Sequence, residues 1–168
     1  NYVTTNNGFT LYDLVSYDRK HNELNGENNR DGENFNYSWN CGAEGPSRKK
    51  NIISLRKNQV TNASMLLLTA QGTPCLLAGD EFYNSQKGNN NAYCQDNEVF
   101  WLQWKDNTQM FQELLSFTQK MITLRKQNRC YVFQNFIMIK LGKIKILNQI
   151  HKNSPYKNYP VFYFFYNN

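Results

Sequence analysis

Residues 51–79, NIISLRKNQVTNASMLLLTAQGTPCLLAG, carry the clearest secondary-structure signal in the chain. Its apolar side chains recur at spacings of three and four, which predicts a helix over residues 51–71. The expected inward stripe of that helix is Ile52, Leu55, Gln59, Ala63, Leu66 and Ala70. Gly72, Thr73 and Pro74 should end it. The uninterrupted apolar run at 75–79 then predicts a short parallel strand buried on both faces.

The same alternation continues on both sides of this stretch. Residues 1–5, NYVTT, are rich in β-branched and aromatic side chains and predict a strand. Residues 108–127 predict a second helix, with apolar side chains on one side at Phe111, Leu114, Leu115, Met121 and Ile122. The order strand, helix, strand, helix indicates the α/β class with a parallel sheet.

Two long polar loops, residues 6–50 and 80–107, follow the predicted strands. A loop of that length inside a compact domain is usually functional or disordered, and the regular aromatic residues between Phe9 and Trp39 favour an ordered one. Both loops leave the carboxyl ends of strands, where α/β barrels place their active sites. The functional residues are therefore expected in the two loops.

Charge is distributed unevenly along the chain. Residues 1–100 carry nine bases and eleven acids, whereas residues 101–168 carry ten bases and two acids, with no acid after Glu113. A basic tail can indicate nucleic acid or an anionic membrane. The loops, however, are acidic and amide-rich and do not interleave basic with aromatic residues, so we expect no nucleic-acid partner. No apolar run approaches the roughly 20 residues of a membrane span, and no membrane partner is expected.

Metal-ligand types are sparse. Four scattered cysteines form no Cys-x-x-Cys pair, and the imidazoles are those of His21 and His151, so we expect no zinc site and no cofactor. Unpaired thiols fit a reducing, cytoplasmic location. The chain opens on Asn1 and not on Met, which leaves a preceding signal peptide open.

Ordered motif blocks fill both loops. The first loop holds KHN (20–22), NGENNRDG (25–32) and SWNCG (38–42), and the second holds GDE (79–81), GNNNAYC (88–94) and QDN (95–97). In this order, over about residues 1–127, they resemble the isoamylase and bacterial glycogen-debranching branch of the α-amylase superfamily. The resemblance implies a (β/α)8 barrel, of which this chain would hold strand–helix units seven and eight. Residues 1–127 would then be the C-terminal part of the catalytic barrel.

The resemblance also implies an activity, hydrolysis of α-1,6-glucosidic branch points in a branched α-glucan such as glycogen or starch. Hydrolases of this family use a carboxylate nucleophile after strand four and a carboxylic acid after strand five. Neither would lie in this chain, so we expect it to be inactive alone. A third carboxylate belongs to a His-Asp pair after strand seven that bonds sugar hydroxyls at the cleavage site.

The positions aligned with that His-Asp pair are Asn6 and Asn7. Asn7 stands where the transition-state-stabilising Asp is expected, and it keeps the size of Asp without its charge. The alternative reading is therefore a non-catalytic, glucan-binding paralogue of isoamylase. Without the neighbouring blocks, the Asn pair would be an ordinary polar turn.

Other loop residues are weaker candidates for substrate binding. His21 and Tyr93 are candidates, although His21 also fits a hydrogen-bonded loop residue. Asp96 and Asn97 fit loop scaffolding and glucan contact equally well, whereas Asp80 and Glu81 are expected to bond loop amides. Four aromatic residues could stack on glucose rings, although core or loop packing is favoured for each of them. They are Trp39, Tyr93, Trp101 and Trp104.

Residues 128–168 form an irregular basic tail with at most one or two weak strands. Acids, periodicity and family motifs all end near its start, and its Lys, Asn, Ile, Tyr and Phe are encoded by A- and T-rich codons. This coincidence favours a shifted reading frame or disorder. A lineage-specific basic extension is the alternative.

Overall fold

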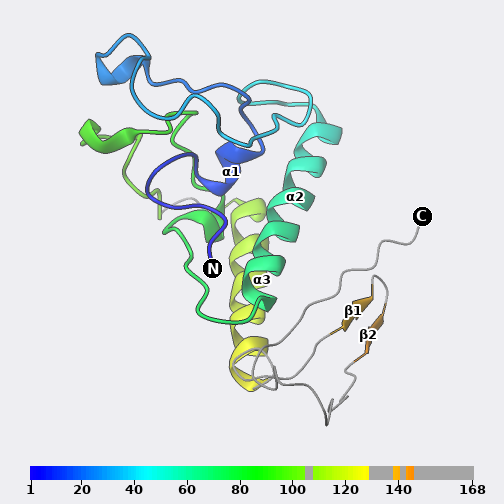
Figure 1. Cartoon of the computed structure of the whole chain (residues 1–168). Coiled ribbons are helices and arrows are strands. Elements are labelled where there is room, and N and C mark those ends of the chain that lie inside the picture. Colours follow the sequence, from blue (N-terminus) through cyan, green and yellow to red (C-terminus); the bar gives the residue numbers. More distant parts are fainter. Residues whose placement is uncertain (105–107, 129–137, 141–142, 146–168) are drawn as a thin grey trace.

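A computed structural model describes residues 1–104, 108–128, 138–140 and 143–145. The elements in chain order are α1 (Leu11–Leu14), η1 (Glu23–Asn25), α2 (Lys50–Thr69), η2 (Asp80–Phe82), η3 (Ala92–Cys94), α3 (Gln109–Gln127), β1 (Met138–Lys140) and β2 (Lys143–Lys145). Figure 1 shows α2 and α3 side by side, with the loops gathered around α1 beside the first half of α2. No helix of the described residues is long and apolar enough to cross a lipid bilayer.

The two long helices are confirmed, with ends within two residues of those expected. The last turn of a helix leaves carbonyl groups without partners. At the end of α2, Arg125 of α3 donates to the carbonyl oxygens of Leu68 at 2.9 Å and Ala70 at 2.7 Å. Nearer its start, Lys57 Nζ lies 2.5 Å from Glu113 Oε2 of α3. These contacts hold the pair of helices together.

The inward stripe of α2 differs from the one expected. Leu66, predicted to face the core, is 50% exposed, whereas Arg56 is 1% exposed. The Arg56 guanidinium donates to the carbonyl oxygens of Gly45 at 2.7 Å and Asn40 at 2.9 Å. Buried carbonyl groups need donors, and hydropathy never counts an arginine as an inward residue. The buried residues of the helix are Ile52, Arg56, Val60, Ser64, Leu67, Leu68 and Thr69.

The core lies between α1, α2 and α3. Its buried members are Leu11, Val15, Cys41, Ile52, Val60 and Leu114. Removing each aliphatic side chain from water contributes about 2 kcal/mol. In α3, Phe111 and Leu114 are buried as expected, and Thr118 is buried beside them. The Thr108 hydroxyl accepts from Phe111 N at 3.3 Å and begins that helix.

The predicted strands at residues 1–5 and 75–79 are not confirmed, because neither segment is a strand in this structure: residues 1–5 contain a bend at Val3, and residues 78–79 form a turn. They meet at one end, where Cys75 N donates to Asn1 O at 2.7 Å and the Asn1 amino group donates to Thr73 O at 2.8 Å. A parallel ladder needs evenly spaced bonds along both strands. Among the described residues, neither segment has a further strand beside it to supply them.

Strands do occur in the tail, where one or two were expected. β1 and β2 pair antiparallel with Ile139 opposite Ile144. The rest of the tail, residues 129–137, 141–142 and 146–168, lies outside the described residues.

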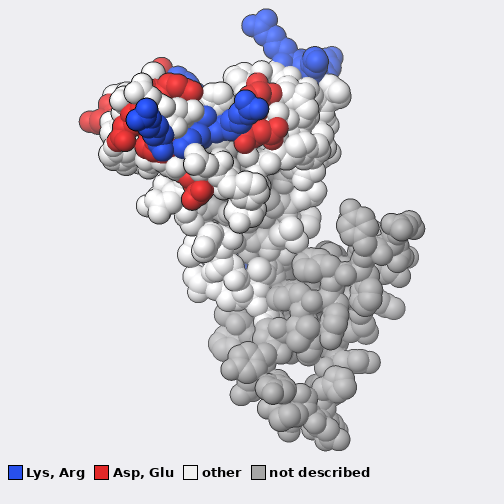
Figure 2. Space-filling model, turned by 45° about the horizontal axis from the view of Figure 1, so that its top comes forward, with Lys and Arg blue, Asp and Glu red and all other residues white. Residues whose placement is uncertain are grey.

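The loop end carries most of the charge seen on the face drawn in Figure 2. Basic and acidic side chains are interspersed there, and on this face the described surface below the loops is largely uncharged. The long first loop is ordered, as expected, and it contains the short helix α1, which the sequence did not predict.

Candidate functional site

The Asn6–Asn7 turn lies at the start of the first loop with both residues exposed. The Thr5 hydroxyl donates to Asn7 O at 3.0 Å and accepts from Asn7 N at 3.3 Å, which closes the turn. The next amide, Gly8 N, donates to Asn90 O at 3.0 Å. The turn is therefore attached to the second loop, 82 residues further along the chain.

His21 joins the same two loops. Its backbone N donates to Gly88 O at 2.7 Å, and its Nε2 lies 3.1 Å from Glu44 Oε1. Glu44 also accepts from the backbone amides of Asp18 and Arg19. Burial raises the pKa of Glu44, but these bonds outweigh it and hold that pKa down at about 2. His21 is thus a hydrogen-bonded loop residue, and its half-exposed ring still faces solvent in part.

A buried pair of amides lies between the loops. Asn22 Nδ2 donates to Asn90 Oδ1 at 2.8 Å, and Asn90 N donates back to Asn22 Oδ1 at 3.0 Å. Asn22 is fully buried and Asn90 is 3% exposed. Around this pair, Asn25 and Asn91 donate to Asp31 Oδ2 at 2.7 and 3.0 Å. Those bonds lower the pKa of Asp31, that from Asn25 most of all.

Two buried carboxylates, Asp13 and Asp80, accept hydrogen bonds from residues of the loops. Asp13 of α1 accepts from the Ser85 hydroxyl at 2.5 Å and from Gln86 N at 2.7 Å. Asp80 accepts from Leu11 N at 2.8 Å and from the Thr4 hydroxyl. Burial raises the pKa of each to about 6, although the hydrogen bonds act in the opposite direction.

The expectation that Asp80 and Glu81 bond loop amides is confirmed. Asp80 accepts from Leu11 N, and Glu81 Oε2 accepts from Gly79 N at 2.8 Å. Both carboxylates therefore stabilise the backbone of the loops.

The remaining candidates lie on the second loop. The Tyr93 hydroxyl donates to Glu27 Oε1 at 2.9 Å, a further contact between the two loops. Asp96 Oδ1 accepts from Trp101 Nε1, and Asn97 Oδ1 accepts from Val99 N, each at 2.9 Å. The structure thus brings the Asn6–Asn7 turn, His21 and Tyr93 onto one pair of joined loops, whereas Asp96 and Asn97 make local contacts.

Core or loop packing was the favoured expectation for four aromatic residues, and of these two alternatives packing in the core is wrong, because all four side chains are exposed. The exposed fractions are 52% for Trp39, 69% for Tyr93, 55% for Trp101 and 60% for Trp104. Local loop contacts account for part of the rings: Trp104 lies 4.8 Å from the Phe82 ring, and Trp101 bonds Asp96. Rings with polar edges remain exposed where a loop surrounds them with hydrogen-bond partners.

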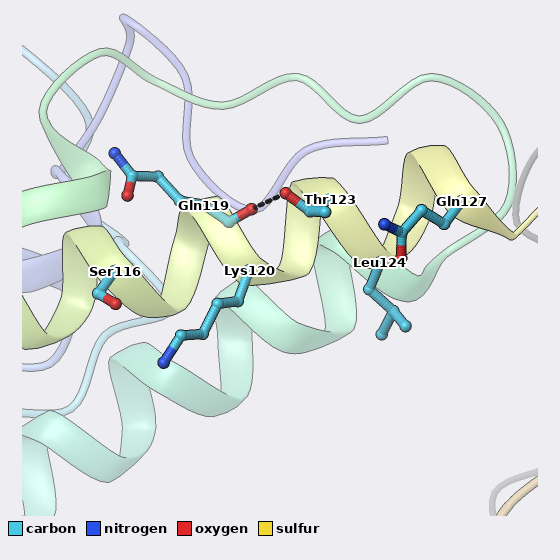
Figure 3. A pocket seen from close by; sticks show the side chains of 6 residues that line it. All are labelled: Ser116, Gln119, Lys120, Thr123, Leu124 and Gln127. Atoms are coloured by element: carbon cyan, nitrogen blue, oxygen red, sulfur yellow. Dashed lines mark hydrogen bonds between the residues drawn. The ribbon is translucent and has the colours of Figure 1, made fainter.

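A shallow hollow on α3 is a separate feature (Figure 3). It is lined by Ser116, Gln119, Lys120, Thr123, Leu124 and Gln127. All six residues belong to one helix, and Thr123 already donates to Gln119 O at 2.9 Å. The hollow has no acid and no residue of either loop, so it does not extend the loop site.

Metal ligands do not gather in the described part of the chain, where no three His, Cys, Asp or Glu residues could hold an ion. Cys41, Cys75 and Cys94 are free thiols. Cys130 and His151 lie outside the described residues.

Sequence reasoning missed the buried residues that join the loops. Asn22, Asn90 and Asp13 belonged to blocks quoted only as motifs or to an unassigned segment. A signal was present, because a dense run of asparagines in a loop has many donors and acceptors to satisfy. Which partners satisfy them depends on contacts across more than 60 residues.

Comparison with known proteins gives close relatives over most of the chain. The "Glycogen operon protein GlgX homolog" of Mycobacterium bovis is 50% identical over 136 residues, 81% of this chain and 19% of the relative. That of Haemophilus influenzae is 53% identical over 133 residues, 76% of this chain and 20% of the relative. The "Glycogen debranching enzyme" of Erwinia tasmaniensis is 52% identical over 127 residues, 76% of this chain and 19% of the relative.

A solved structure, "Pullulanase from Bacillus acidopullulyticus", shares the fold over 83% of this chain and 14% of its own, with a TM-score of 0.56 and 22% identity. No family model matches the sequence. The chain spans about a fifth of the length of the curated relatives it matches.

These likenesses confirm the resemblance predicted from the motif blocks. The chain belongs to the family of the bacterial glycogen-debranching proteins. Its likeness to the pullulanase structure shows a shared fold.

Proposed function

We propose that this chain forms strand–helix units seven and eight of a (β/α)8 barrel that hydrolyses α-1,6-glucosidic branch points in glycogen or starch. In this proposal residues 1–127 are the C-terminal part of the catalytic barrel and residues 128–168 lie outside it. The sequence identity of 50% to a glycogen operon protein and of 52% to a glycogen debranching enzyme supports a branched α-glucan as the substrate. The fold likeness to a pullulanase supports the barrel.

The observation that carries the proposal is the attachment of the Asn6–Asn7 turn to the second loop. Gly8 N bonds Asn90 O at 3.0 Å, and two residues before Asn90 the Gly88 carbonyl accepts from His21 N. The aligned position of a sugar-contacting pair thus lies beside joined loops rich in amides. Amides and carboxylates together offer the donors and acceptors that sugar hydroxyls require.

In the proposed site, Asn7 faces the reacting sugar and Asn6, His21 and Tyr93 contact sugars around it. The exposure of Asn6, Asn7 and Tyr93 supports these roles. Asp96 and Asn97 are assigned a weaker contact, because their side chains already hold Trp101 and Val99. No cofactor is part of the proposed reaction, which runs on carboxylates elsewhere in the barrel.

A second candidate function is glucan binding without catalysis, in an isoamylase-like paralogue. Asn7 favours it, because a neutral amide stabilises an oxocarbenium-like transition state less than a carboxylate would. Branched α-glucan is the partner in both versions, in the cytoplasm, and neither nucleic acid nor membrane is proposed. The free thiols of Cys41, Cys75 and Cys94 support a reducing compartment.

The test compares ligands on the full-length protein. Binding to glycogen that is insensitive to salt is the expected result, and release of linear maltooligosaccharides from glycogen would distinguish the hydrolase from the binding paralogue. Binding to an oligonucleotide that weakens steeply with salt, with no binding to glycogen, would contradict both versions.

A further inference from the structure

We propose that Asn90 is a positioning residue that fixes the Asn6–Asn7 turn relative to the loop carrying His21. The inference rests on the proposed function for its relation to sugar, but its structural part stands on contacts within this chain. Asn90 itself need not touch a glucan, because it is only 3% exposed.

Asn90 bonds three separate segments at once. Its carbonyl accepts from Gly8 N of the turn at 3.0 Å, and its backbone N–H donates to Asn22 Oδ1 at 3.0 Å. Its side-chain oxygen accepts from Asn22 Nδ2 at 2.8 Å. Its Nδ2 donates to Glu33 O at 2.8 Å and to Asn36 Oδ1 at 2.6 Å. Both backbone groups and both side-chain atoms are thus used.

The partner Asn22 is held as firmly. It is fully buried, its Nδ2 also donates to Asp31 O at 3.0 Å, and its N donates to Asn29 Oδ1 at 2.9 Å. Asn22 follows His21 directly in the chain. A displacement of Asn90 therefore moves the turn and the His21 segment relative to each other, since buried polar groups keep their partners.

Gly32 leaves the space that this pair occupies. A methyl group at Gly32 would collide with Asn90 Oδ1 and would lie 2.7 Å from Asn22 Nδ2. Gly26 offers a matched control, because its φ of +79° is close to the +70° of Gly32 and a methyl group there meets nothing within 4 Å. The two Gly→Ala changes share the strain of a left-handed backbone, and they differ in the collision with the amide pair.

The first experiment measures hydrogen exchange in the full-length protein. In Gly32→Ala, and in Asn90→Asp, where a carboxylate oxygen replaces the Nδ2 donor, the Gly8 amide should exchange about tenfold faster than in the unchanged protein. Gly26→Ala should leave it unchanged, and the amides within α2 should keep their protection in all variants. Equal exchange at Gly8 in Gly32→Ala and Gly26→Ala would overturn the proposal.

The second experiment tests whether the pair acts through the turn. Gly32→Ala should weaken binding of a branched maltooligosaccharide about tenfold, and this loss should vanish in an Asn7→Gly background, as a double-mutant cycle reveals. A loss of the same size in both backgrounds would show general loop damage and would overturn positioning through Asn7. If the unchanged protein does not bind the oligosaccharide, the proposed function fails, and the exchange at Gly8 alone decides the proposal about Asn90.

Discussion

At the scale of single residues, the proposed alignment places Asn6 and Asn7 at the positions of a His-Asp pair, so that Asn7 would lack the charge of the Asp. Asn7 occupies an exposed turn that is closed by the Thr5 hydroxyl. The turn is held in place by its neighbours, so the amide and a carboxylate of the same size would occupy similar positions. The difference between them should therefore appear in the chemistry of the site and not in its shape.

We expect Asn7→Asp in the full-length protein to raise turnover about 10²-fold while changing glucan affinity little, because the restored charge acts mainly on the oxocarbenium-like transition state. The companion change Asn6→His completes the pair. The measurement is release of reducing ends from glycogen together with binding to glycogen. Equal turnover before and after the double change would show that Asn6 and Asn7 are not the aligned pair.

The buried Asp13 predicts a dependence of stability on pH. Burial raises its pKa from 3.8 to about 6, so its protonated form is favoured in the folded chain. Its contribution is complete below about pH 4 and is lost as the pH rises through 6. Asp80 has the same sign, whereas Glu44, with a pKa lowered from 4.5 to about 2, acts only at lower pH. The free energy of unfolding should fall between about pH 4.5 and 7.

Urea denaturation across that range measures how the free energy of unfolding changes with pH. Asp13→Asn should reduce this change by about half, since a neutral amide does not titrate. The amide oxygen can still accept from Gln86 N, and the amide Nδ2 can donate to the Ser85 hydroxyl, which in the unchanged protein donates to Asp13 Oδ1. Glu23→Gln, which removes an exposed acid of η1, is the control and should leave the slope unchanged. A slope unaltered by Asp13→Asn would contradict the assignment.

At the scale of elements, α2 depends on a charge inside its packed face. Arg56 donates to the carbonyl oxygens of Gly45, Asn40 and Ala43, and so attaches the end of the first loop to the helix. The Asn40 carbonyl oxygen also accepts from Ala43 N at 3.3 Å, so Arg56 adds a second donor there. The loop and the helix therefore fold as one unit.

We expect Arg56→Met to lower the free energy of unfolding by about 3 kcal/mol, because it removes the hydrogen bonds to the buried Gly45 carbonyl and to the partly buried carbonyls of Asn40 and Ala43. Lys57→Met is the matched control on the same helix. Its ion pair with Glu113 is partly exposed, so its loss should cost less than about 1 kcal/mol. Chemical denaturation of both variants measures the difference, and similar losses would refute the assigned role of Arg56.

At the scale of the whole molecule, we expect the isolated chain to release no maltooligosaccharide from branched glucan. Two strand–helix units do not close a barrel, and the proposed nucleophile and acid lie elsewhere. The assay compares the purified chain with the full-length protein on glycogen. Detectable product from the chain alone would overturn the proposed division of the catalytic residues.

The basic tail gives the last prediction, and it concerns the gene. We propose that residues 128–168 come from a shifted reading frame, because the family resemblance and the helical periodicity end near residue 127 and the tail beyond it contains no acid. One of the other two frames beyond this point should then resume a debranching-enzyme sequence. If neither frame does, the tail is a basic extension of this lineage, and the proposal is wrong.

The two long helices, the family and the loops that carry the candidate site could all be predicted from the amino-acid sequence. Periodicity, helix stop signals and ordered motif blocks are local properties, so they survive without any knowledge of packing. The same properties failed at residues 1–5 and 75–79, because β-propensity does not provide the neighbouring strand that a ladder needs.

The burial of particular polar side chains is known from the tertiary structure and could not be predicted from the sequence. Arg56 faces inward, where its guanidinium donates to carbonyl groups of the first loop, and Asn22 and Asn90 pair across 68 residues, a separation that no short window of sequence spans. Such pairings depend on where the loops meet in space. The motifs predicted which loop residues are candidates for the site. The attachment of the second loop to the Asn6–Asn7 turn was not predicted, because it depends on hydrogen bonds between buried groups of the two loops.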